Sequence, residues 1–171
     1  MEYTCTSFLD KFKKHTVWSF HFKIPDTIAL ALLKTSKRVV CVINNDVSYQ
    51  CGLLSAGDLG YFVNVNATIR KAARIELNDR VSLFLKSDTS KYGLPVPEVF
   101  LELLTQDDEF EEIFHALTHG KQRSLIHLVG TFKSERKQME QTMCIREYLL
   151  QVKGKLDYKE LNLAFKNSRY K

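Results

Sequence analysis

Two glutamates and two histidines between positions 111 and 119 have the spacing of a metal site. Glu111, His115 and His119 recur every fourth residue, so one face of a continuous helix would carry all three. Glu112 precedes His115 by three residues, which is also a ligand spacing. Two histidines one helical turn apart bind zinc when a third ligand joins them. A metal-dependent enzyme that uses these four residues is therefore one interpretation of the chain.

The surrounding sequence favours the absence of a metal. Gly120 directly follows His119 and would end the helix there. No companion motif of Cys or His at ligand spacing occurs elsewhere in the 171 residues. We therefore expect no metal and no other cofactor. His21 lies on the polar side of an aromatic strand, and we expect it to be structural or on the surface.

Basic side chains are the second group that could bind a ligand. Arg70, Lys71 and Arg74 fall within one short predicted helix, where Arg70 and Arg74 would share a face. Two guanidinium groups on one face could hold one phosphate or carboxylate. Near a break between later helices, a second basic set consists of Lys121, Arg123, Lys133, Arg136 and Lys137. The opposing interpretation is that both sets are solvated helix faces or pair with nearby carboxylates.

Charge is divided unevenly along the chain, whose formal net charge is +5. Residues 1–94 carry 13 basic and 8 acidic side chains, residues 95–120 carry 7 acidic and no basic ones, and residues 121–171 carry 12 basic and 5 acidic ones. Uncompensated basic regions attract polyanions. We therefore expect nucleic acid or another polyanion to bind a surface that includes Arg70, Lys71 and Arg74. The alternative is a protein partner held by the acidic stretch or by an exposed apolar patch.

Signals for covalent or nucleotide chemistry are missing from the sequence. It has no G-x-S-x-G motif, and its 7 glycines form no Walker or dinucleotide-binding loop. The cysteines have no regular spacing and no histidine at a diagnostic distance, so we expect reduced, mostly buried thiols at Cys5, Cys41, Cys51 and Cys144. These absences favour a non-catalytic binding module over a conventional enzyme.

The elements that must position these residues change character near residue 90. Before it, short apolar or alternating segments are separated by Asn-, Asp- and Gly-containing turns, a pattern typical of a small β-barrel. The first strand carries an aromatic face of Trp18, Phe20 and Phe22, and further strands are expected at 39–43, 47–54, 61–65 and 81–85. Short helices are expected at 26–33 and, capped by Asn66, at 67–74.

After residue 90 the periodicity becomes helical. Residues 91–97 have the composition of a linker between a barrel domain at 1–90 and a helical domain at 98–171. Pro97 opens the first helix, and a capping box at 105–108 opens the second. Further helices are expected at 124–129, 134–150 and 157–165. The predicted fold class is α+β, a closed small barrel followed by a three- or four-helix segment packed on it.

Two parts of the sequence resemble bacterial families. Residues 1–95 are similar to a barrel family of unknown function with the pattern V-R-K-A-x-G-I-x-x-G-D-x-V, through Gly60-Tyr61-Phe62-Val63, Ile69-Arg70-Lys71-Ala72-Ala73-Arg74-Ile75 and Asn78-Asp79-Arg80-Val81. Arg74 and Asn78 stand where that family often has glycine. Residues 96 to about 150 resemble the helical domain of the YdeI/OmpD-associated family, through Pro97-Glu98-Val99, Phe114-His115-Ala116-Leu117 and the segment from Gln122 to Lys133. That family's basic run is partly kept as Phe132-Lys133 and Glu135-Arg136-Lys137.

The resemblance implies a fold and little chemistry. It implies a double-split barrel of about six strands, related in shape to AbrB-type DNA binders, which commonly form by exchange of hairpins between chains. For the helical half, sometimes labelled bacteriocin protection, it implies an alternative role in stress or antimicrobial protection. Six strands from one chain could close the barrel alone, and the helical half could cover its apolar face. We therefore expect a monomer.

No segment of the sequence indicates export or membrane insertion. Met1-Glu2-Tyr3-Thr4 is acidic where a signal peptide begins with basic residues. The longest aliphatic run, residues 28–33, is far shorter than the roughly 20 residues that span a bilayer. We therefore expect a cytoplasmic protein with no membrane partner.

Overall fold

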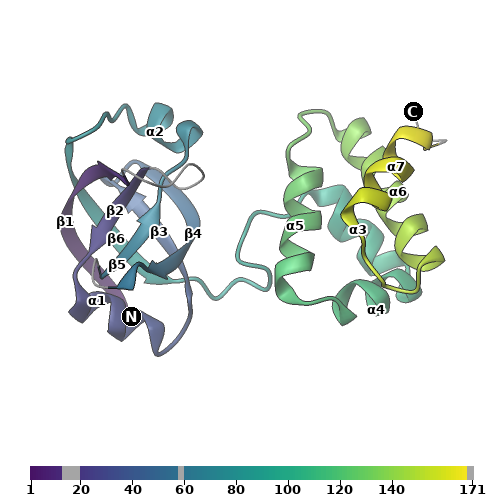
Figure 1. Cartoon of the computed structure of the whole chain (residues 1–171), viewed down its shortest axis with the longest axis horizontal. Helices are drawn as coiled ribbons and strands as arrows, with labels where there is room; N and C mark the ends of the chain where they lie inside the picture. The colour runs from purple at the N-terminus through teal and green to yellow at the C-terminus, as the bar shows by residue number, and fades with distance from the viewer. Residues whose placement is uncertain (13–19, 58–59, 169–171) are drawn as a thin grey trace. The chain divides into compact units, whose positions relative to one another are not determined.

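The computed structural model describes residues 1–12, 20–57 and 60–168. The chain divides into two compact units, Met1–Gly93 and Leu94–Lys171. In the described residues, strands and two short helices form the first unit and helices alone form the second (Figure 1). The predicted fold class, an antiparallel barrel followed by a helical segment, is confirmed.

The strands of the first unit close into one antiparallel barrel in the order β1-β2-β5-β4-β3-β6. Their bounds are β1 (Glu2–Lys11), β2 (Phe20–Ile24), β3 (Arg38–Ile43), β4 (Val47–Ser55), β5 (Tyr61–Asn64) and β6 (Arg80–Ser87). The first and last strands complete the ring, with Glu2 opposite Lys86 and Phe8 opposite Arg80. A closed ring leaves no strand edge with unpaired backbone groups.

Alternate side chains of each strand fill the barrel interior. Val39, Cys41 and Ile43 on β3 are fully buried, as are Leu83 and Leu85 on β6, which is the period-two pattern of a strand with one face inward. From the predicted aromatic face, Phe22 is buried in the core, and Phe20, together with Tyr49 and Tyr61, is partly buried against it. Phe62 instead packs outside this core cluster, against Phe12 and His21. Trp18 lies outside the described residues.

The two short helices of the barrel unit lie at opposite ends of the barrel (Figure 1). Helix α1 (Asp26–Leu33) follows Pro25 and joins β2 to β3, and α2 (Ala67–Ala73) joins β5 to β6. Asn66 caps α2 as predicted, because its side-chain oxygen accepts a hydrogen bond of 2.9 Å from the Ile69 N–H. Ile69 and Ala73 pack against the barrel core, so α2 covers one end of the barrel.

The segment after β6 is fastened to the barrel by a polar network. Asp88 accepts hydrogen bonds from the N–H and hydroxyl of Ser90 and from the Gln50 amide, and Arg38 donates to the Gly93 carbonyl. Burial raises the pKa of Asp88, but the hydrogen bonds from Ser90 and Gln50 and the charge of Arg38 outweigh it and hold this pKa below its ordinary value. Residues 88–93 therefore belong to the barrel unit.

The second unit is an arrangement of helices around α6. Its elements are α3 (Glu98–Gln106), α4 (Asp108–Ala116), α5 (His119–Gly130), α6 (Glu135–Gln151) and α7 (Tyr158–Asn167). The described residues thus contain five helices, where three or four were expected. Helix α6 packs against each of the other four, and Phe100, Phe110 and Phe114 form an aromatic cluster with centroid separations of 5.2 to 6.0 Å. None of the described helices has both the length and the apolar character needed to cross a bilayer.

Side-chain caps set the helix boundaries of the second unit. The predicted capping box at Thr105 is wrong, because α3 continues through Gln106 and Asp107 caps α4 by accepting from the Phe110 N–H at 2.9 Å. The other carboxylate oxygen of Asp107 pairs with Arg146 on α6. Ser134 and Asp157 cap the last two helices.

Candidate functional site

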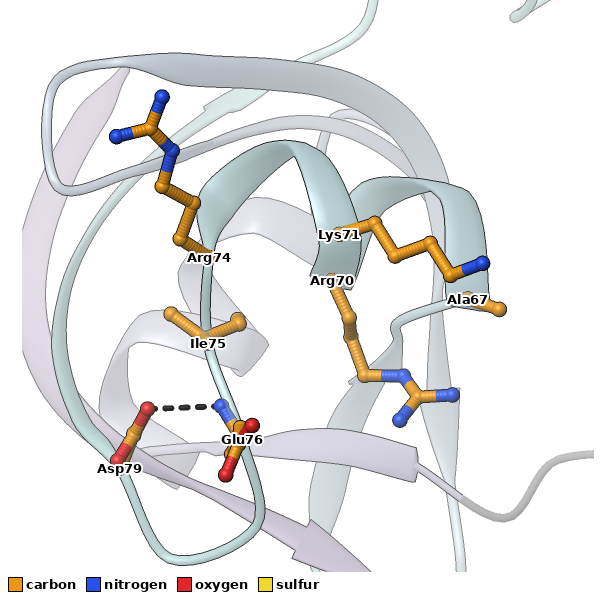
Figure 2. A pocket seen from close by; sticks show the side chains of 7 residues that line it. All are labelled: Ala67, Arg70, Lys71, Arg74, Ile75, Glu76 and Asp79. Atoms are coloured by element: carbon orange, nitrogen blue, oxygen red, sulfur yellow. Dashed lines mark hydrogen bonds between the residues drawn. The ribbon is translucent and has the colours of Figure 1, made fainter.

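A groove of about 490 Å³ opens beside α2 at the end of the barrel. The side chains that line it are Ala67, Arg70, Lys71, Arg74, Ile75, Glu76 and Asp79 (Figure 2). The structure therefore brings together the three basic residues singled out in the sequence. It also adds two carboxylates to the same groove wall.

The basic side chains leave α2 in different directions (Figure 2). Arg74 is the C-cap residue of α2, and its backbone angles are left-handed, φ 52° and ψ 47°. The helix therefore ends before Arg74, and its side chain does not project from the same helix face as the side chain of Arg70. The Arg70 guanidinium points toward β2, and the Arg74 guanidinium points away from it. The expectation that both lie on one helix face is wrong, and the cations are spread around the end of the barrel instead.

Arg70 lies over the aromatic ring of Phe20, which Lys11 also approaches. Its Cζ lies 3.5 Å from the centroid of Phe20, and the Nζ of Lys11 lies 5.5 Å from the same centroid. Lys11 reaches this ring because it is directly opposite Phe20 in the pairing of β1 with β2. Such cation–π contacts fix the position of a charged side chain that remains partly in solvent. Lys11 is thus a further basic residue at this end of the barrel, and sequence analysis missed it.

Within the part of the chain that the structure describes, these four cations are in no ion pair with a carboxylate. None of the ion pairs between described residues involves Lys11, Arg70, Lys71 or Arg74. Asp79, which lines the same groove, accepts a hydrogen bond of 2.7 Å from the backbone N–H of Glu76. The Nε of Arg70 is buried and has no hydrogen-bond acceptor within the described ranges. An incoming anion would therefore meet cations that are in no ion pair with a described carboxylate.

Two residues of the second predicted basic set, Arg136 and Lys137, pair with one glutamate. Glu140 accepts from Lys137 at 2.6 Å and from Arg136 at 3.0 Å. The hydrogen bond from Lys137, reinforced by Arg136, holds the pKa of Glu140 below its ordinary value although burial opposes it. Lys133 is exposed in the turn before α6. Arg136 and Lys137 are therefore already paired with a carboxylate, whereas Arg70, Lys71 and Arg74 are in none of the ion pairs between described residues.

A helix boundary separates His119 from the other three residues of the predicted metal site, Glu111, Glu112 and His115. Helix α4 ends at Ala116, Thr118 caps α5, and His119 is the first residue of that helix. Gly120 lies in the first turn of α5, so it does not end a helix as expected. His115 instead approaches Glu111, with 3.6 Å between Nδ1 and Oε1. Among the described residues, no three His, Cys, Asp or Glu side chains are grouped closely enough to hold a metal ion.

The remaining reactive side chains have structural surroundings. The four cysteines are free thiols, three buried and Cys5 half-buried, which confirms the sequence expectation. His21 is only 7% exposed and stacks on Phe12, with ring centroids 3.8 Å apart. A smaller groove of about 340 Å³ between α6 and α7 is lined by Cys144, Tyr148 and five other residues, none of them basic. The α2 groove is therefore the candidate site.

Comparison with known proteins bears on the barrel unit. Neither the curated proteins nor the solved structures gave a match to the chain. Residues 6–85 match the sequence model of a family described as "Domain of unknown function (DUF1905)". This range begins within β1, ends within β6 and includes α2 with Arg70, Lys71 and Arg74. This match shows that the barrel unit of this chain is similar to DUF1905 domains.

Proposed function

We propose that this protein is a non-catalytic binding module that holds a polyanion of the nucleic-acid class at the α2 groove. One observation carries the proposal: Arg70, Lys71 and Arg74 line a single groove, and none of them is in an ion pair with a described carboxylate. Their charges are spread over the end of the barrel, which suits a chain of phosphates better than one small anion.

The test is a binding titration against mixed DNA and mixed RNA at about 50 and 200 mM salt. Phosphate contacts release counterions, so the affinity of the wild type should fall steeply between these two conditions. The double variant Arg70→Ala/Arg74→Ala should bind more weakly and show a shallower salt dependence. No binding at low salt, or binding that ignores both salt and the substitutions, would contradict the proposal.

A matched control removes the same charge from the other end of the barrel. Lys34 and Lys37 are exposed and follow α1, which lies at the end of the barrel opposite α2 (Figure 1). The double variant Lys34→Ala/Lys37→Ala has the same net charge as the test variant. It should keep wild-type affinity if binding is localised at α2, and an equal loss in both variants would indicate non-specific attraction.

Two further parts of the proposal rest on the sequence. We propose a cytoplasmic location, which cell fractionation with an antibody to the protein would test. We also propose that the helical unit is related to the YdeI/OmpD-associated domains that it resembles. A solved structure of such a domain that superimposes on α3–α7 would support this relation, and a different helix order would contradict it.

A further inference from the structure

Lys11 and Arg70 form a pair of cations beside one aromatic ring. The Phe20 ring fixes both, at 5.5 Å from Nζ of Lys11 and 3.5 Å from Cζ of Arg70. An anion that lies beside this ring would be attracted by both charges. No described carboxylate pairs with either residue, so the described residues do not supply that anion.

A phosphate group carries the negative charge and the acceptor oxygens that an arginine and a lysine can bind together. The guanidinium of arginine presents a planar fork of donors, and lysine adds a point charge with three donors. The Arg70 Nε is buried without an acceptor in the described residues, although the side chain as a whole is only half-buried. The position of Arg70 on Phe20 also limits its freedom before a ligand arrives, so less side-chain entropy is lost on binding.

The surroundings of this pair favour a flexible strand over a duplex. Glu76 and Asp79 lie in the groove wall, on the loop that leads from α2 to β6. A duplex presents its phosphates in a fixed register and would bring some of them against these carboxylates. A single strand can bend from Lys11 and Arg70 toward Lys71 and Arg74 and avoid them.

An exposed aromatic side chain lies on the strand that carries Lys11. Phe8 is 58% exposed on β1, three residues before Lys11 and directly opposite Arg80 on β6. Its neighbour Leu9 exchanges backbone hydrogen bonds with the loop, donating to Asp79 at 2.9 Å and accepting from Asn78 at 2.8 Å. Exposed aromatic rings next to basic side chains are the stacking surfaces of single-strand binders.

We propose that the α2 groove binds single-stranded nucleic acid, with a phosphate held jointly by Lys11 and Arg70 and a base stacked on Phe8. This step rests on the proposed function and narrows it to one class of nucleic acid. It also assigns Lys11 and Phe8 to the site, two residues outside the groove lining.

The experiment compares a labelled oligothymidylate of about 12 nucleotides with a duplex of the same length. With about four phosphates contacted, the logarithm of the affinity for the single strand should fall with a slope of about −3 against the logarithm of salt, roughly fifty-fold for a fourfold increase. Lys11→Gln should reduce that slope by about 0.7. Phe8→Ala should weaken binding about tenfold and leave the slope unchanged.

The control is Lys34→Gln, which removes one exposed charge at the other end of the barrel. Lys11 and Phe8 are both exposed, so their variants should fold, and circular dichroism verifies this. Duplex binding as tight as single-strand binding would overturn the narrower proposal and leave the proposed function intact. A Lys11→Gln variant that behaves like Lys34→Gln would overturn the shared phosphate contact. No binding to either probe at low salt would overturn the proposed function itself.

Discussion

The buried thiols of the barrel have surroundings that suppress their reactivity. Burial raises the pKa of Cys41 to about 12, and burial raises the pKa of Cys51 as well. The thiolate is the reactive form of cysteine, so a raised pKa and low accessibility both protect these residues. We expect a disulfide reagent at neutral pH to leave Cys41 and Cys51 unmodified in the native protein and to modify both in urea. Rapid modification of either residue without denaturant would contradict the buried positions.

In the loop between α2 and β6, two residues have backbone angles that are usually found at glycine. Arg74 has φ 52° and Asn78 has φ 73°, and both stand where the resembled barrel family often has glycine. Asparagine tolerates this region, whereas arginine is strained there because its Cβ approaches the following carbonyl. A strained residue that also lines the candidate groove suggests that its side chain is retained for binding.

Replacing Arg74 with glycine should therefore change stability and binding in opposite directions. We expect Arg74→Gly to raise the free energy of unfolding by about 0.5 to 1 kcal/mol, because the left-handed angles cost glycine less. The same variant should bind nucleic acid more weakly. Urea denaturation and the salt titration check the two effects, and a variant that is less stable would show that Arg74 is not strained.

At the scale of elements, Asp107 joins three helices of the second unit. It follows α3, caps α4 and pairs with Arg146 on α6. The backbone hydrogen bond from Phe110, followed by the contact with Arg146, holds the pKa of Asp107 below its ordinary value although burial opposes it. A lowered native pKa means that this contribution to stability is complete above about pH 4 and is lost as the pH falls through the native pKa.

The variant Asp107→Asn removes the negative charge that faces Arg146 and keeps the helix cap, because asparagine is also a good capping residue. We expect it to lower the free energy of unfolding by about 1 kcal/mol at pH 7, because Arg146 loses its carboxylate partner. The difference from wild type should shrink below pH 4 as the wild-type carboxyl protonates. The control Glu112→Gln removes one exposed charge from the same helix, and an equal loss there would show that the effect is not specific to Asp107.

Strand β1 shows why one element escaped the sequence analysis. Its inward positions are Tyr3, Cys5, Ser7 and Leu9, a mixture too polar to stand out as an apolar alternation. The predicted bounds of the other strands and of α1 are close to the observed ones. Their inner faces are aliphatic or aromatic, and Asn, Asp or Pro marks their ends. The boundary between α4 and α5 was missed for a related reason. Leu117 continues the apolar spacing of α4 although its backbone is already extended.

Only the residues of the candidate site that are neighbours in the sequence could be predicted from it. Arg70, Lys71 and Arg74 are close in sequence, so a charge pattern identifies them. Lys11 and Phe20 join them only through the pairing of β1 with β2, and no short-range pattern encodes that register. The direction of Arg74 depends on a left-handed residue that helical spacing cannot anticipate.

At the scale of the whole molecule, barrel closure bears on assembly. All six described strands come from one chain and each pairs with two neighbours, so no strand edge is left for a second copy and no exchanged hairpin is needed. We expect a monomer of 19.8 kDa. Light scattering coupled to size exclusion at micromolar concentration measures this mass directly, and a stable dimer would show that another surface mediates association.

The pairing of β1 with β6 also has a consequence for how the protein is synthesised. The ribosome makes β1 first and β6 last among the strands, so the barrel cannot close until residue 87 has emerged. Until then the apolar faces of the earlier strands are exposed, and such intermediates aggregate readily or recruit chaperones. The helices of the second unit are translated only after this point. The time between the emergence of the first and the last strand is therefore the interval in which a newly made chain is most vulnerable.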